Sequence, residues 1–217
     1  GVVEILSSRR EYTKINPLVV LLGRGEHQIT STCTDGSIGP YRNILTITRS
    51  NIAFHGTGKE TTTILGGFGI NNQQNITLKQ MTVTNIDEGN GAGIHMVLGK
   101  IELMDMAFRN CSHAGLYVSH SVSAEIVVVA TRCEFSGSNY GATFNGSLTN
   151  VTFKNCVFND NKVDGIIGYS STIHLHGEAT AIHSNGRYGI FATRSAKVVI
   201  HLPSHHNTFY NNGGEDR

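Results

Sequence analysis

One pattern, written three times in succession between Gly141 and Asn212, constrains the fold more than any other feature of this sequence. Each copy opens with glycine and a short apolar strand, continues with a second strand of alternating apolar residues, and closes on a third strand near an asparagine. The frame extends towards the N-terminus, with glycines 24, 22, 26, 24 and 24 residues apart at Gly69, Gly93, Gly115, Gly141, Gly165 and Gly189. A repeat of this length must stack on its neighbours to bury its apolar face.

The repeat unit has the period of β-strands and contains no helical pattern. Apolar residues alternate with polar ones, as in Ile173 and Leu175, so one set of side chains points inward and the other outward. Parallel strands need a long connection, and the rest of each unit supplies it. The sequence therefore predicts an all-β, single-domain, right-handed parallel β-helix of about seven coils with 22–26 residues each.

Three columns of stacked residues follow from this register. Apolar anchors six or seven residues before each coil's start should form one interior column: Phe108, Phe135, Phe158, Ile182 and Phe209. Two residues earlier, on the same face, stand Met106, Cys133, Cys156, Thr180 and Asn207. Small polar residues stand where the chain turns: Cys111, Ser138, Asn161, Asn185 and Asn212. Because asparagine tolerates left-handed backbone angles and bonds to nearby backbone, we expect the third column to form a hydrogen-bonded ladder.

Glycine-initiated coils, interior aliphatic and phenylalanine stacks, and asparagine at the turns resemble the pectin-lyase-like superfamily of right-handed β-helices. Residues 19–30 (VVLLGRGEHQIT) resemble the entry strand and turn of such folds, and residues 45–67 resemble their recurrent strand, glycine turn and strand. The resemblance covers most of the chain and is specific for the fold. Since the superfamily includes lyases, hydrolases, uronan epimerases, phage tailspikes, adhesins and non-catalytic interaction domains, it implies no single activity.

Charge and hydropathy exclude two classes of partner. The net charge is +1 and no run of basic residues is longer than Arg9–Arg10, which argues against nucleic acid. No apolar stretch approaches the roughly 20 residues that span a bilayer. Residues 1–18 stand outside the repeat and are expected to cap the β-helix of residues 19–217, with a lateral excursion at residues 31–43. The polar C-terminal end is expected to continue into further coils or to meet a protein partner.

The cysteines and glycosylation triplets leave the compartment open. None of the four cysteines has CxxC spacing, so a zinc ribbon is not expected. Cys133 and Cys156 should be interior neighbours, as buried free thiols rather than the disulfide that their proximity also allows. Four N-x-S/T triplets are compatible with a secreted or surface protein and begin at Asn75, Asn110, Asn145 and Asn150.

Six of the eleven histidines lie in the last two predicted coils: His174, His176, His183, His201, His205 and His206. Aligning the two IHL tripeptides places His174 directly beside His201 on the outward face of one sheet, with His176 on that face. Imidazoles on strands about 4.8 Å apart can bind a transition metal, hold a sugar or transfer protons. A metal needs a third ligand, for which His205 and Glu178 are candidates, so the sequence assigns no metal and no cofactor.

Candidate catalytic residues gather in one turn. A lyase or epimerase needs groups that neutralise a uronate and remove its C5 proton, and a hydrolase needs two carboxylates across the scissile bond. The turn offers Asp160, Lys162 and Asp164, but the sequence has no Asp-Asp pair. YGATF at 140–144 and YGIFA at 188–192 resemble the Tyr-Gly strand starts of uronan epimerases, without the Asp-Pro-His continuation that carries that family's chemistry.

The sequence therefore favours a non-catalytic module that recognises a glycan or a protein over an enzyme. Two alternatives stay open: a polysaccharide-modifying lyase, hydrolase or epimerase, and a structural subunit of a larger assembly. Aromatic rings offer sugars an apolar platform, and arginine offers directed donors to carboxylates. The predicted ligand residues are His174, His176, His201, Arg187, Tyr188 and Arg194.

Overall fold

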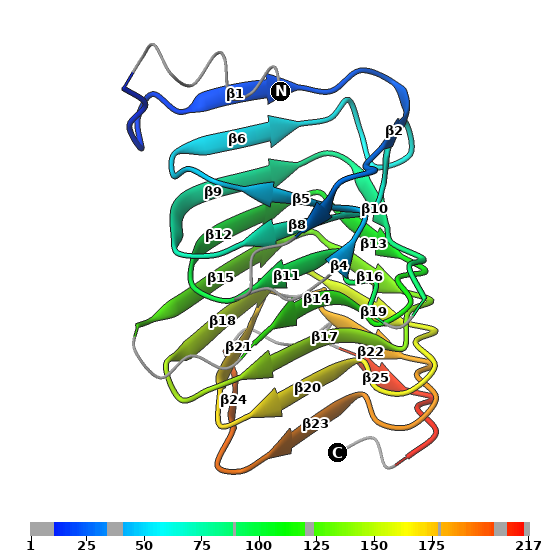
Figure 1. Cartoon of the computed structure of the whole chain (residues 1–217). Coiled ribbons are helices and arrows are strands. Elements are labelled where there is room, and N and C mark those ends of the chain that lie inside the picture. Colours follow the sequence, from blue (N-terminus) through cyan, green and yellow to red (C-terminus); the bar gives the residue numbers. More distant parts are fainter. Residues whose placement is uncertain are drawn as a thin grey trace.

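The computed structural model describes residues 11–33, 41–88, 90–119, 124–177, 179–201 and 208–214. Within these ranges every regular element is a strand, and the strands stack into a rod with β1 near one end and β23 near the other (Figure 1). Three parallel sheets run along the rod. The predicted parallel β-helix is therefore confirmed. No helix that could cross a membrane is found in the described ranges.

Each coil contributes one strand to each sheet in turn, so sequential neighbours along a sheet are about one coil apart in sequence. The first sheet consists of β1 (Leu18–Leu21), β6 (Ile52–His55), β9 (Gln73–Lys79), β12 (Gly99–Met104), β15 (Ile126–Thr131), β18 (Thr149–Lys154), β21 (Thr172–His176) and β24 (Lys197–Ile200). The second consists of β2 (Gly25–Gln28), β7 (Thr62–Leu65), β10 (Thr82–Thr84), β13 (Ala107–Arg109), β16 (Glu134–Ser136), β19 (Val157–Asn159), β22 (Ala181–His183) and β25 (Thr208–Tyr210). The third consists of β5 (Ile44–Ile47), β8 (Gly67–Ile70), β11 (Ile94–Met96), β14 (Ala114–Val118), β17 (Tyr140–Asn145), β20 (Ile166–Tyr169) and β23 (Ile190–Thr193).

A short hairpin branches off the first coil. β3 (Thr32–Cys33) pairs antiparallel with β4 (Tyr41–Arg42), within the segment for which a lateral excursion was predicted. Residues 1–10 lie outside the described ranges, so the N-terminal cap over residues 1–18 stays a prediction.

The predicted anchor column lies inside the second sheet. Phe108 pairs with Phe135, Phe135 with Phe158, Phe158 with Ile182, and Ile182 with Phe209. The Phe135 and Phe158 rings stack with centroids 4.7 Å apart and an interplanar angle of 4°. Two residues earlier, Met106, Cys133, Cys156 and Thr180 are buried, and Asn207 lies outside the described residues. Cys133 and Cys156 are free thiols, as the sequence favoured.

The predicted ladder of turn residues is also present. Asn161 donates from Nδ2 to Oδ1 of Asn185 at 2.9 Å, and Asn185 donates in the same way to Asn212 at 2.8 Å. Each side chain also donates to a backbone carbonyl of the preceding coil. The expected left-handed angles fall one residue earlier than the ladder, on Asp160, Ser184 and Asn211 among others. The ladder residues are thus free to adopt ordinary angles while their amides join the coils.

The glycine frame needs one correction. Ile94 pairs with Phe68, so the glycine that aligns with Gly93 is Gly67 and not Gly69, which lies beside His95 instead. Close packing explains the column, because a Cβ on Gly165 would lie only 2.6 Å from the carbonyl oxygen of Gly189. A side chain at this position would therefore push adjacent coils apart.

Candidate functional site

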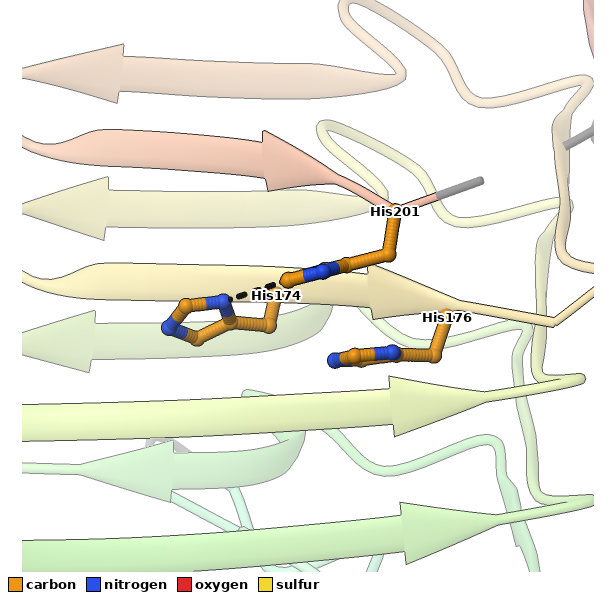
Figure 2. A group of neighbouring side chains, drawn as sticks. All are labelled: His174, His176 and His201. Atoms are coloured by element: carbon orange, nitrogen blue, oxygen red, sulfur yellow. Dashed lines mark hydrogen bonds between the residues drawn. The ribbon is translucent and has the colours of Figure 1, made fainter. Parts of the chain in front are cut away.

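Three histidines gather on the outer face of the first sheet, at its C-terminal end (Figure 2). In β21, Ile173 and Leu175 are buried and the alternating residues His174 and His176 point outward. The next coil supplies His201 directly after β24, where its backbone N–H donates to the Leu175 carbonyl at 2.9 Å. Period-two alternation and strand pairing thus bring the three imidazoles to one place.

The predicted neighbour of His201 was wrong by two residues. Ile173 pairs with Val198 and His174 with Val199, so His201 lies beside His176 and not directly beside His174. A shift of two residues keeps a side chain on the same face of a strand. All three histidines therefore still share the outer face, as expected. Glu178 and His205, the candidate third ligands from the sequence, lie outside the described residues.

The three rings are in mutual contact and half-exposed. Nδ1 of His174 lies 2.8 Å from Nε2 of His201, a hydrogen bond that one neutral ring donates and the other accepts. The His176 and His201 rings stack with centroids 3.7 Å apart and an interplanar angle of 10°. Burial lowers the pKa of His174 and of His176, and the neighbouring imidazoles and lysines lower it further. His174 and His176 thus favour the neutral imidazole.

Arg187 and Tyr188 lie elsewhere, in the segment between β22 and β23. The Asp164 carboxylate is fully buried and accepts two bonds from Arg187, at 3.0 Å from Nε and at 2.6 Å from Nη2. It also accepts the Tyr188 backbone N–H at 3.0 Å. The guanidinium carbon is held 5.0 Å from the Tyr188 ring centroid and 5.1 Å from that of Phe191. The two rings stack with centroids 5.5 Å apart.

The remaining sequence candidates are dispersed. Arg194 occupies the turn from the third sheet to the first, with its guanidinium 5.5 Å from the Tyr169 ring. Asp160 is exposed in a left-handed turn and accepts a bond from the Asn159 amide at 2.5 Å. Lys162 is exposed. Asp164, the third candidate carboxylate, is engaged by Arg187, so the turn presents no pair of free carboxylates.

Sequence reasoning missed a row of aromatic and imidazole rings on the outer face of the third sheet. Strand pairing aligns one outward residue from each of five successive strands: His95, Tyr117, Thr143, Ile167 and Phe191. His95 lies 5.0 Å from Tyr117 between ring centroids. Each column member stands two residues after a column glycine, which is the signal in the sequence that points to them.

Two further rings extend this row towards Arg187. His113 lies 5.0 Å from Tyr117 and 5.8 Å from Tyr140, in both cases edge-on. Burial lowers the pKa of His113 and raises that of Tyr117. Burial, followed by His113, lowers the pKa of His95 to about 4. Because these pKa values keep imidazole and phenol neutral near pH 7, this part of the face carries neutral hydrogen-bonding groups.

Comparison with known proteins defines the class of the molecule. The family model described as the right handed beta helix region matches residues 92–215, more than half of the 217 residues. The chain therefore belongs to the right-handed β-helix family, whose architecture agrees with the pectin-lyase-like resemblance of the sequence. No curated protein matches the chain by sequence.

Solved structures share the fold over most of this chain. The A-module of the Azotobacter vinelandii mannuronan C-5 epimerase AlgE4 is 14% identical with a TM-score of 0.55, over 93% of this chain and 65% of that one. The AlgE6 A-module of the same organism is 12% identical with a TM-score of 0.53, over 92% and 64%. ORF18 of Geobacillus virus E2 is 13% identical with a TM-score of 0.39, over 89% and 52%. The chain thus spans slightly less than two thirds of the epimerase modules.

Proposed function

We propose that this β-helix is a non-catalytic recognition module for an acidic glycan, which binds over the outer face of the third sheet at Arg187, Tyr188 and Phe191. One observation carries the proposal: the buried Asp164 carboxylate fixes the Arg187 guanidinium over two stacked rings. Stacked rings offer the apolar face of a sugar a flat platform. A guanidinium offers the sugar's carboxylate donors in a fixed plane.

The bonding of Arg187 leaves capacity for a ligand. Nε and Nη2 donate to Asp164, and Nη1 has no hydrogen-bond partner among the described residues. The side chain keeps 48% of its surface exposed, so a ligand can reach Nη1 without displacing Asp164. A preorganised donor loses little conformational entropy on binding.

Binding is tested with immobilised neutral, uronate and sulfated polysaccharides, followed by calorimetry with a uronate oligosaccharide. We expect uronate polysaccharides to retain the protein and their masses to stay unchanged after incubation. Tyr188→Ala should bind the uronate oligosaccharide roughly tenfold more weakly, equivalent to about 1.4 kcal/mol. Tyr210→Ala is the matched control, because Tyr210 is an exposed ring near the same end of the rod but on the second sheet. Equal losses in both variants, or no retention by wild type, would reject the proposed surface.

A second candidate function rests on the ring cluster of the same face. His113 contacts both Tyr117 and Tyr140, so an imidazole and a phenol can remove and return a proton at one sugar carbon. Arg187 would neutralise the adjacent carboxylate. This arrangement would suit a lyase or a C5 epimerase of uronates, and the two modules that share the fold are named mannuronan C-5 epimerases.

Product analysis separates the two functions. Unsaturated or epimerised uronate residues, detected by mass and NMR and abolished in Tyr117→Phe, would establish the enzyme and reject the non-catalytic module. Intact polysaccharide after long incubation with a binding-competent protein would reject the enzyme. If the protein neither binds nor converts any glycan and instead associates with rising concentration in sedimentation, the structural subunit replaces both.

A further inference from the structure

We propose that His174, His176 and His201 bind one transition-metal ion of the zinc type, with three imidazole nitrogens and one water as ligands. The site lies on the first sheet and is independent of the glycan face on the third. The described residues contain one group of at least three potential metal ligands that meet at one place, and it is this one.

The backbone fixes the positions of the three histidine Cα atoms. His174 and His176 are two residues apart on one strand and therefore share a face. His201 reaches the same face from the adjacent coil, anchored by its backbone bond to Leu175. Adjacent strands lie about 4.8 Å apart, within the reach of two imidazoles that meet at one ion. Because β21 holds His174 and His176 and a backbone hydrogen bond holds His201, little backbone ordering is needed on binding.

The ligand nitrogens already lie near their coordinating positions. One nitrogen from each ring can be chosen such that all three lie within 4.8 Å of one another. A tetrahedral ion with metal–nitrogen bonds of about 2.0–2.1 Å separates its ligands by about 3.3 Å. The 2.8 Å contact between His174 and His201 must open slightly, and the stacked rings of His176 and His201 must rotate so that both planes contain the ion. The three side chains are only half-buried, so they are free to make these rotations.

The donor set selects the class of metal. Three neutral imidazoles suit zinc, copper, nickel and cobalt, whereas calcium and magnesium prefer oxygen ligands. Lys154, which flanks His176 on the neighbouring strand, and Lys197 at the start of β24 place positive charge near the ion. These charges weaken the site relative to one supported by carboxylates. The open outward side leaves the fourth position to water, as in zinc sites with three protein ligands.

Metal binding would connect the last two coils. β21 and β24 are held together by strand pairing near the end of the first sheet, and an ion shared by His176 and His201 adds a cross-link between them. An ion that binds the folded state but not the unfolded state stabilises the fold in proportion to its affinity and concentration. The expected consequence is a rise in melting temperature with zinc.

The test uses the chain without a polyhistidine tag, stripped of metal by a chelator and titrated with zinc against a chromophoric competitor. We expect one zinc per chain and at least tenfold weaker binding in each of His174→Gln, His176→Gln and His201→Gln. His183→Gln is the matched control, because His183 lies in the same region on the second sheet, stacked on Tyr210. Its affinity for zinc should equal that of wild type. Circular dichroism confirms that each variant is folded.

Cobalt provides a second readout, which reports the coordination geometry of the bound ion. A four-coordinate cobalt ion absorbs strongly in the visible range, and we expect this band in wild type and in His183→Gln but not in His176→Gln. The proposal is overturned if wild type binds no more zinc than the variant that lacks all three histidines. It is also overturned if His183→Gln weakens binding as much as the three cluster variants do.

Discussion

The outer faces of the third and first sheets both carry ionisable side chains but use them differently. Beside the third sheet, in the turn before β20, Asp164 is fully buried and held by Arg187. On β11, His95 is 3% exposed against Tyr117. On the first sheet, His174 and His201 are half-exposed and contact other imidazoles. The buried groups beside the third sheet thus stabilise one another and leave the exposed part of Arg187 for a ligand, whereas all three imidazoles on the first sheet are half-exposed. Residue type alone does not distinguish these roles, and burial does.

The largest expected effect is the loss of Arg187. Arg187→Ala leaves the buried Asp164 carboxylate without its cation, and we expect a loss of about 2–4 kcal/mol in the free energy of unfolding. This is below the ~3–5 kcal/mol of a fully buried pair, because Arg187 is half-exposed and water can replace part of it. Urea unfolding provides the measurement. Lys162→Ala, an exposed residue of the preceding coil, should change stability by less than about 0.5 kcal/mol. Equal losses of stability in the two variants would contradict the stabilising role of the Arg187–Asp164 pair.

The second prediction concerns pH and the buried face of the third sheet. The pKa of His95 is about 4 in the folded chain against the ordinary histidine value of 6.5, so the unfolded chain binds more protons between these values. Stability due to His95 is therefore fully present above pH 6.5 and is lost as the pH falls from 6.5 towards 4. The loss should be roughly 1–3 kcal/mol. His113, whose pKa is also lowered by burial, acts in the same direction.

His95→Phe isolates this contribution, since it keeps a ring in the column and removes the titration. The difference in unfolding free energy between wild type and His95→Phe should change between pH 7 and pH 4.5. A difference that is constant over this range would show that His95 is protonated as easily in the folded chain as in the unfolded one. The contrast between the buried groups of the third sheet and the half-exposed histidines of the first would then not hold for His95.

The fold could be predicted from the sequence because each coil repeats the same pattern. A wrong assignment in one coil therefore does not change the architecture that the other coils indicate. The two register errors have a common cause. Gly67 and Gly69 each precede a buried apolar residue, Phe68 and Ile70, so both fit the same place in the repeat. The tripeptide Ile173–Leu175 matches Ile200–Leu202 in residue identity, although the structure pairs Ile173 with Val198. Both errors equal two residues, which moves a residue along a strand and leaves it on the same face. The histidine face was therefore predicted correctly from a wrong pairing.

The hydrogen-bond and ring contacts of the candidate residues could not be predicted from the sequence in the same way. Asp164 and Arg187 are 23 residues apart, and their bond depends on how deeply one turn is buried beneath the next. No local pattern encodes that depth. His95, His113 and Tyr117 were missed for a related reason, because they come from two strands and a turn and become a group only when the coils stack.

The smallest expected effect belongs to the histidine face without metal. His201→Ala removes a half-exposed hydrogen bond to His174 and a stacking contact with His176. Such a bond contributes little net stability, because water replaces the lost partner. In the presence of a chelator we therefore expect a change of less than about 0.5 kcal/mol in urea unfolding. A loss above about 1 kcal/mol would mean that the imidazoles support the last coil by themselves and that the two faces do not differ. A small loss in chelator combined with a large loss of the zinc-induced rise in melting temperature would instead confirm that these side chains stabilise the fold only through an added ion.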